Sequence, residues 1–167
     1  MSGVLGIDLG EKRIGVALAE GDGSGARALT TLRRARDPGR DAAALRELVD
    51  RHAVVELVVG LPLEAAGQEG SQAAITRDWV EAIRGILGDD LAITMRDERL
   101  TSHLAETRLG PMPRGRSGGP PTRTQRDAYR ARVDREAAAI ILQDELDTRS
   151  DARASSTRPQ TTMETRS

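Results

Sequence analysis

Three acidic residues that lie far apart in the sequence are the candidates for chemistry: Asp8, Glu98 and Asp134. Asp8 interrupts the apolar run "VLGIDLG", although strands are depleted in Asp and a buried carboxylate is costly unless its charge is compensated. Glu98 ends a second apolar run and Asp134 precedes a third. Carboxylates held close together raise one another's pKa unless a cation neutralises them, and their oxygens suit Mg²⁺. If the three converge, they make a metal site fit for phosphodiester hydrolysis.

Each of these acids also has a structural interpretation. Asp8 could be a buried hydrogen-bond acceptor, although perturbed buried acids favour functional sites. Glu98 could pair with Arg96 or Arg99 at the end of a strand. Asp134 could be a helix cap or a first-turn acid, and taken alone this interpretation is the stronger one for it. The choice depends on whether the fold brings the three together.

The hydrophobic periodicity predicts the elements that must position these acids. Period-two and continuous apolar runs predict five strands, and period-3.6 runs predict helices between and after them. The strands are expected at 4–9, 13–19, 28–32, 54–63 and 91–98, and the helices at 37–52, 71–87, 101–109 and 134–146. Ile75, Trp79, Ile83 and Ile86 are expected to face the core from the second helix. Asp134 then lies at the start of the last helix.

This order of elements predicts an α/β fold with a mixed five-stranded sheet flanked by helices. The first three strands form an antiparallel meander and the last two join as parallel strands, which leaves the first strand central. We expect one domain over residues 1–147. Residues 148–167 are mostly Ser, Thr, Arg and Asp, and we expect a disordered C-terminal tail there.

The charge distribution predicts an anionic partner. The segment from Arg108 to Arg135 holds eight arginines and two aspartates, a local net charge of +6, whereas the whole chain has −1. Much of this charge lies on a predicted loop at 111–127, rich in Pro and Gly. A basic loop beside an acidic site would bind a nucleic-acid backbone. The candidate phosphate contacts, on charge and position alone, are Arg13, Arg114, Arg116, Arg123 and Arg126.

The composition also excludes some classes of protein. The chain has no Cys, which excludes disulfides, thiolate metal sites and a Cys nucleophile. No stretch approaches the roughly 20 apolar residues of a membrane helix, and there is no basic segment followed by an apolar run at the N-terminus. We therefore expect a cytoplasmic protein that does not bind membranes.

Four segments together resemble the YqgF family, also called RuvX: "GIDLGEKRIGVALAE", "VVGLPLEAAGQEG", "RDERLTS" and "RVDREAAAIILQDEL". The resemblance runs from Val4 to about Asp147. It implies an RNase H-like fold and a nuclease dependent on Mg²⁺ or Mn²⁺ that matures the 5′ end of the precursor of 16S ribosomal RNA. It also implies that Asp8, Glu98 and Asp134 are the catalytic, metal-binding residues. The family often has Asn and Asp after "GLPL", where this chain has "EAA".

Other functions stay open at this point. The same site could resolve four-way DNA junctions as a Holliday junction resolvase, since both reactions attack a phosphodiester. The chain could be a non-catalytic RNA-binding factor in ribosome assembly, although that role does not need three acids. A sugar kinase or actin-like ATPase is disfavoured, because that architecture needs two such domains around a nucleotide. The sequence leaves the oligomeric state open between a monomer and a weak homodimer.

Overall fold

The computed structural model describes residues 2–99 and 101–157, and their core is a five-stranded mixed sheet in the order β3-β2-β1-β4-β5. The strands are β1 (Gly3–Leu9), β2 (Arg13–Ala19), β3 (Ala26–Arg33), β4 (Val54–Pro62) and β5 (Ala92–Glu98). β1, β2 and β3 pair antiparallel, whereas β4 is parallel to both β1 and β5. The predicted sheet, with its three-strand meander and central first strand, is confirmed.

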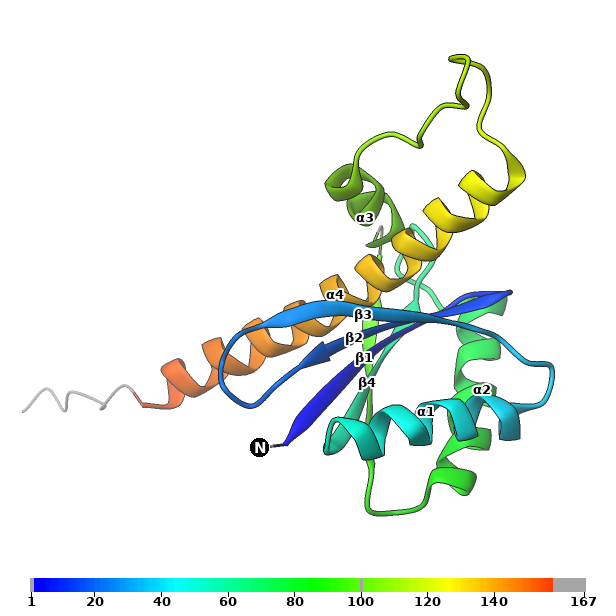
Figure 1. The fold of residues 1–167 in the computed structure, drawn as a ribbon. Helices are drawn as coiled ribbons and strands as arrows, with labels where there is room; N and C mark the ends of the chain where they lie inside the picture. The colour runs from blue at the N-terminus through cyan, green and yellow to red at the C-terminus, as the bar shows by residue number, and fades with distance from the viewer. Residues whose placement is uncertain (1, 100, 158–167) are drawn as a thin grey trace, which may run out of the picture.

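Helices cover both faces of this sheet (Figure 1). They are α1 (Pro38–Arg51), α2 (Ser71–Leu87), α3 (Thr101–Leu109) and α4 (Arg123–Ser156). α1 and α2 pack on one face, over a core that includes Leu5, Ile7 and Trp79. α4 crosses the other face, and α3 packs against α4. In the described part of the chain, no helix is long and apolar enough to cross a membrane.

Two glycines on the sheet allow α4 to lie very close to it. A Cβ atom at Gly6 would lie 2.6 Å from the carbonyl oxygen of Ala138, and one at Gly15 would collide with the carbonyl oxygen of Asp134. Gly15 is also the register partner of Asp8 on the neighbouring strand. The absence of a side chain at Gly15 therefore brings the backbone of α4 to the sheet beside Asp8.

The last helix differs from its prediction at both ends. It begins at Arg123, eleven residues before Asp134, because Thr122 and Gln125 form a capping box that the Pro- and Gly-rich surroundings concealed. It continues to Ser156, so residues 148–156, which we expected to be disordered, are helical. Arg149 accounts for part of this extension, since it pairs with Glu56 on β4 and Glu145 one turn earlier. The rest of the predicted tail, 158–167, lies outside the described residues.

The orientation of α2 was predicted only in part. Trp79 and Ile83 are buried as expected, whereas Ile75 and Ile86 are 44% and 55% exposed. The positions they were expected to fill are taken by Val80 and Leu87. The buried stripe is thus rotated slightly around the helix, a shift that does not alter its place on the sheet.

Candidate active site

Asp8 and Glu98 line one small cavity at the carboxyl ends of β1 and β5. The cavity has a volume of about 120 Å³, and its other walls come from Leu9, Gly60, Pro62 and Gln72. β4 lies between the two acidic strands, and Gly60 on β4 has no side chain to separate them. A Cβ atom at that position would lie 3.1 Å from Cγ of Glu98 and 2.6 Å from Cδ1 of Ile141. The fold therefore brings two of the three predicted acids together.

Both carboxylates in the cavity bind protons more tightly than usual. Burial raises the pKa of Asp8 to about 7, and the negative charge of Asp134 adds to the effect. The pKa of Glu98 is also raised to about 7, mainly by burial and further by the charges of Asp8 and Asp144, against a hydrogen bond from Thr101 that lowers it. Two acids that share a cavity and repel each other favour a cation between them.

Asp134 approaches the site from α4 but does not line the cavity. Its Oδ2 atom accepts a hydrogen bond from Nε of Arg13 at 2.6 Å, a contact between residues 121 positions apart. Its charge still contributes to the raised pKa of Asp8. Within 2–99 and 101–157, no group of three or more His, Cys, Asp or Glu side chains forms a ready metal site. Asp134 thus lies close to the other acids and forms an ion pair with Arg13.

The structural interpretations of two acids are wrong. Asp134 is not a helix cap or a first-turn acid, because α4 begins at Arg123. Glu98 is not hydrogen-bonded to Arg96, because that guanidinium donates instead to Glu145 at 2.9 Å. Glu98 accepts a hydrogen bond from the Thr101 hydroxyl at the start of α3. This contact holds the carboxylate without neutralising its charge.

Of the predicted phosphate-binding arginines, the structure brings only Arg13 to the acids. Arg114 and Arg126 donate to backbone carbonyls of the 111–122 segment, those of Gly118 and Pro121 respectively. Arg116 is exposed, and Arg123, 91% exposed, lies 3.9 Å from Asp127. None of the four lines the cavity of Asp8 and Glu98.

Gln72 is a residue of the site that the sequence analysis missed. It lies in the first turn of α2, which follows the loop after β4, and its side chain forms part of the cavity wall. An amide can donate and accept hydrogen bonds, so Gln72 can bind either a water molecule or a phosphate oxygen. No motif marked it. The only signal was its position at the start of the helix that follows "GLPL".

The donor set of the cavity fits a divalent cation. Mg²⁺ commonly binds through one or two protein carboxylates and completes its coordination with waters and substrate phosphate oxygens. Asp8 and Glu98 supply the two carboxylates, and the pKa of each stays raised, although the charge of Arg96 partly offsets that of Glu98. Asp134 can join such a site through Oδ1, because the hydrogen bond from Arg13 uses its Oδ2.

The sheet order and the flanking helices define an RNase H-like domain, and the acidic cavity lies at the carboxyl ends of its strands. A family model described as "RuvX: Holliday junction resolvase" matches residues 2–148. The chain therefore belongs to the RuvX family, as the sequence resemblance predicted.

Relatives and solved structures agree with this assignment. A protein of Anaeromyxobacter dehalogenans is 42% identical over 145 residues, covering 87% of this chain and 96% of its own, and one of Chloroflexus aggregans is 40% identical over 146 residues, covering 87% and 94%. Both are named "Putative pre-16S rRNA nuclease". Thermus thermophilus RuvC, solved with a Holliday junction substrate, aligns with a TM-score of 0.52 and 15% identity over 90% of this chain and 97% of its own. That likeness confirms the RNase H-like fold.

Proposed function

We propose that the protein is a divalent-metal-dependent endonuclease that processes the 5′ end of the 16S ribosomal RNA precursor in the cytoplasm. The observation that carries this proposal is the cavity shared by Asp8 and Glu98, two carboxylates with raised pKa at the ends of the parallel strands β1 and β5. The substrate is suggested by the relatives, which are named for that RNA at about 40% identity over most of their length.

In this proposal each residue of the site has a distinct part. Asp8 and Glu98 hold Mg²⁺ or Mn²⁺, and Asp134 stands beside them as a further ligand whose Oδ2 is hydrogen-bonded to Arg13. When bound, the metal supplies Lewis-acid stabilisation of the phosphoryl oxygens and lowers the pKa of a coordinated water. Thr101 orients Glu98 through its hydrogen bond. Gln72 binds the attacking water or a non-bridging oxygen from the cavity wall.

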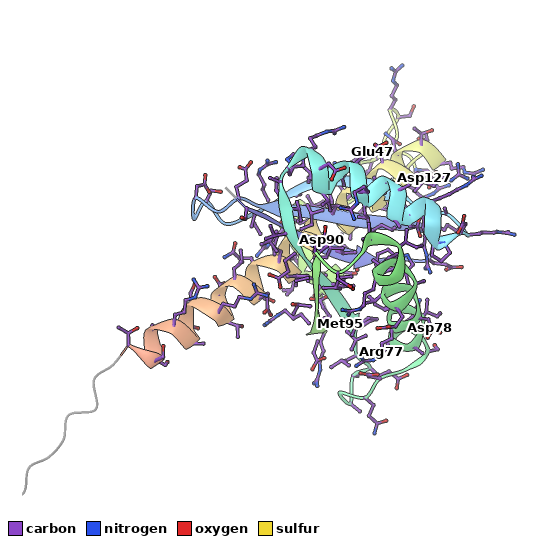
Figure 2. The ribbon with its side chains drawn as sticks, turned by 90° about the horizontal axis from the view of Figure 1, so that it is seen from below. Glu47, Arg77, Asp78, Asp90, Met95 and Asp127 are labelled. Carbon is purple, nitrogen blue, oxygen red and sulfur yellow. The ribbon has the colours of Figure 1, made fainter. Side chains whose placement is uncertain are left out.

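The test is cleavage of a 16S precursor RNA fragment with Mg²⁺, with Mn²⁺ and with EDTA. Wild type should cleave only with metal, and Asp8→Asn should not cleave. Asp78→Asn is the matched control, since Asp78 is an exposed residue on α2, labelled in Figure 2, that forms no ion pair within the described residues and is not in the cavity. Cleavage by Asp8→Asn at the control's rate would contradict the proposal.

A second candidate function is cleavage of four-way DNA junctions. It is favoured by the description of the family and by the RuvC-like fold. The same variants should be assayed in parallel on a four-way junction and on the RNA, at equal enzyme and metal concentrations. Binding of RNA without cleavage of either substrate would instead support a non-catalytic assembly factor.

A further inference from the structure

A second, larger groove lies beside the acidic cavity and has the opposite charge. It has a volume of about 370 Å³ and runs between the facing ends of β2 and β3 and the first turns of α4. Lys12, Arg13 and Arg33 line it from the strands, and Arg123 and Asp127 from the helix. Arg13 both lines the groove and contacts Asp134, so this residue connects the groove to the acidic site.

The positive charge of this groove is largely unpaired. Lys12 and Arg33 are exposed, and within the described part of the chain neither has a carboxylate within 4.0 Å. Arg123 has only the long 3.9 Å contact with Asp127. Of the four cationic side chains, Arg13 pairs with Asp134 and Arg123 with Asp127, so Lys12 and Arg33 carry the unpaired charge. By contrast, two of the loop arginines, Arg114 and Arg126, are committed to backbone carbonyls of their own segment.

The face of α4 that joins the groove to the acidic site is long enough for a short nucleic-acid segment. Arg123, Asp127, Ala131 and Asp134 are spaced by four, four and three residues, so they lie on one face of α4. At 1.5 Å per residue, the eleven residues from Arg123 to Asp134 span about 16 Å. A duplex strand rises 3.4 Å per nucleotide, so this length accommodates about five nucleotides. The Thr31 hydroxyl donates to the carbonyl of Ala131 and holds β3 against α4 along the way.

We propose that this groove binds the phosphodiester backbone of the substrate strand and leads it to the cavity of Asp8 and Glu98. The inference rests on the proposed function and adds the place where the substrate is held. Lys12, Arg33 and Arg123 contact phosphates away from the reaction, and Arg13 stands at the junction of groove and cavity. Asp127, which lines the groove from the first turns of α4, is labelled in Figure 2. Such contacts position the strand and do not read its bases.

The experiment compares two triple variants that remove equal charge. Lys12→Ala/Arg33→Ala/Arg123→Ala empties the groove. Arg27→Ala/Arg51→Ala/Arg153→Ala is the matched control, because these exposed arginines lie at the other end of the sheet and helix and Arg27 has a similar 3.9 Å contact, with Glu20. Binding of fluorescent 15-nucleotide RNA and DNA strands of one sequence is measured by anisotropy without divalent metal, from low to high salt. Thermal unfolding of each variant checks its fold.

The groove variant should bind less tightly, and its plot of log affinity against log salt should be shallower by about 2, since each single-strand phosphate contact contributes about 0.7. The control should keep the wild-type slope. A change seen with both strands identifies the backbone as the ligand, and a change seen with only one identifies that nucleic acid. A slope equal to that of the control, or a larger loss in Arg114→Ala/Arg116→Ala/Arg126→Ala, would overturn the proposal. Binding is measured separately from cleavage. If the groove variant binds normally and wild type cleaves RNA, the groove proposal is contradicted and the proposed function is not.

Discussion

Acidic residues occur at both ends of the surface where α4 crosses the sheet. At one end they are hydrogen-bonded to arginines, and at the other end their pKa is raised by burial. Away from the cavity, Glu56 accepts two hydrogen bonds from Arg149, at 2.6 and 2.9 Å, and Glu145 accepts one each from Arg149 and Arg96. The hydrogen bonds from Arg149 hold the pKa of Glu56 below its usual value. At the cavity, burial raises the pKa of Asp8 and Glu98 to about 7.

Under the proposed function, this difference separates a structural group of charges from a functional one. A half-buried acid that is fully hydrogen-bonded to arginine holds two elements together and has no capacity left for a ligand. An acid buried beside other acids destabilises the protein on its own and becomes favourable only when a cation arrives. The extension of α4 to Ser156 belongs to the first group, because it places Arg149 opposite Glu56.

The largest expected effect comes from Asp8→Asn, which removes one of the two cavity carboxylates. Loss of a residue that merely supports a ligand typically costs about 10–100-fold, so loss of the ligand itself should reduce metal-dependent cleavage further. In the comparison, Glu56→Gln should keep cleavage and lower stability. Initial cleavage rates measure the effect of each variant on activity, and thermal unfolding measures its effect on stability. The reverse pattern would show that the two acid groups have been assigned the wrong way round.

Asp8→Asn should also change the pH dependence of stability. The pKa of Asp8 is raised to about 7 in the folded state, so ionising this carboxyl group lowers the free energy of unfolding. This loss of stability is absent below about pH 4, grows between pH 4 and 7, and is complete above pH 7. Without metal, Asp8→Asn should therefore be more stable than wild type at pH 8, and the difference should vanish toward pH 4. Melting temperatures in EDTA across this range measure it. A variant less stable than wild type at pH 8 would point to a structural Asp8.

Gly15→Ala should destabilise the protein near the cavity by disrupting the packing of α4 on the sheet. Its methyl group would meet backbone atoms of Asp134, which cannot rotate away, so α4 must move off β2. Overpacking of this kind costs about 1–3 kcal/mol, and the melting temperature should fall by several degrees. Gly85→Ala is the control, since that exposed helical glycine has open space around it and should gain up to about 1 kcal/mol. Equal stability of the two variants would show that the close approach is unimportant.

Arg149→Ala should lower the stability of the protein at the end of the sheet away from the cavity. It leaves Glu56 without its guanidinium partner and Glu145 with Arg96 alone, at a cost of about 1–2 kcal/mol. Arg153→Ala, one turn further along α4, removes the same charge from an exposed side chain that forms no ion pair in the described part of the chain, and it should have little effect. Thermal unfolding at neutral pH compares them. The difference should shrink as the pH falls below 4.5, where Glu56 is protonated in the unfolded chain and then in the folded protein.

Arg13→Gln should have the smallest effect and should sharpen the role of Asp134. With the guanidinium removed, the charge of Arg13 no longer offsets that of Asp134 beside the proposed metal site. Affinity for Mn²⁺ should rise about threefold to fivefold, as expected for loss of a partly exposed ion pair worth up to about 1 kcal/mol. Calorimetric titration with Mn²⁺ measures this directly. Unchanged affinity would mean that Asp134 is not a ligand.

Asp8 and Glu98 could be found from the sequence because each stands out within a few residues of its own strand. An acid inside or at the end of an apolar run is a local pattern, and parallel strands place such ends at one edge of a sheet. Asp134 was also found, but with the wrong local surroundings. The capping box of Thr122 and Gln125, which starts α4 eleven residues earlier, was hidden among the prolines and glycines around it.

The sequence by itself determined the sheet, the order of its strands and the two acids of the cavity, because periodicity and strand ends are local properties of the chain. Only the tertiary structure decided that Arg13 holds Asp134, that Arg149 holds Glu56, and that Lys12 and Arg33 share a groove with Arg123. These contacts join residues about 90 to 120 positions apart. They depend on the path of α4 across the sheet, which the missing side chains of Gly6 and Gly15 allow to come so close.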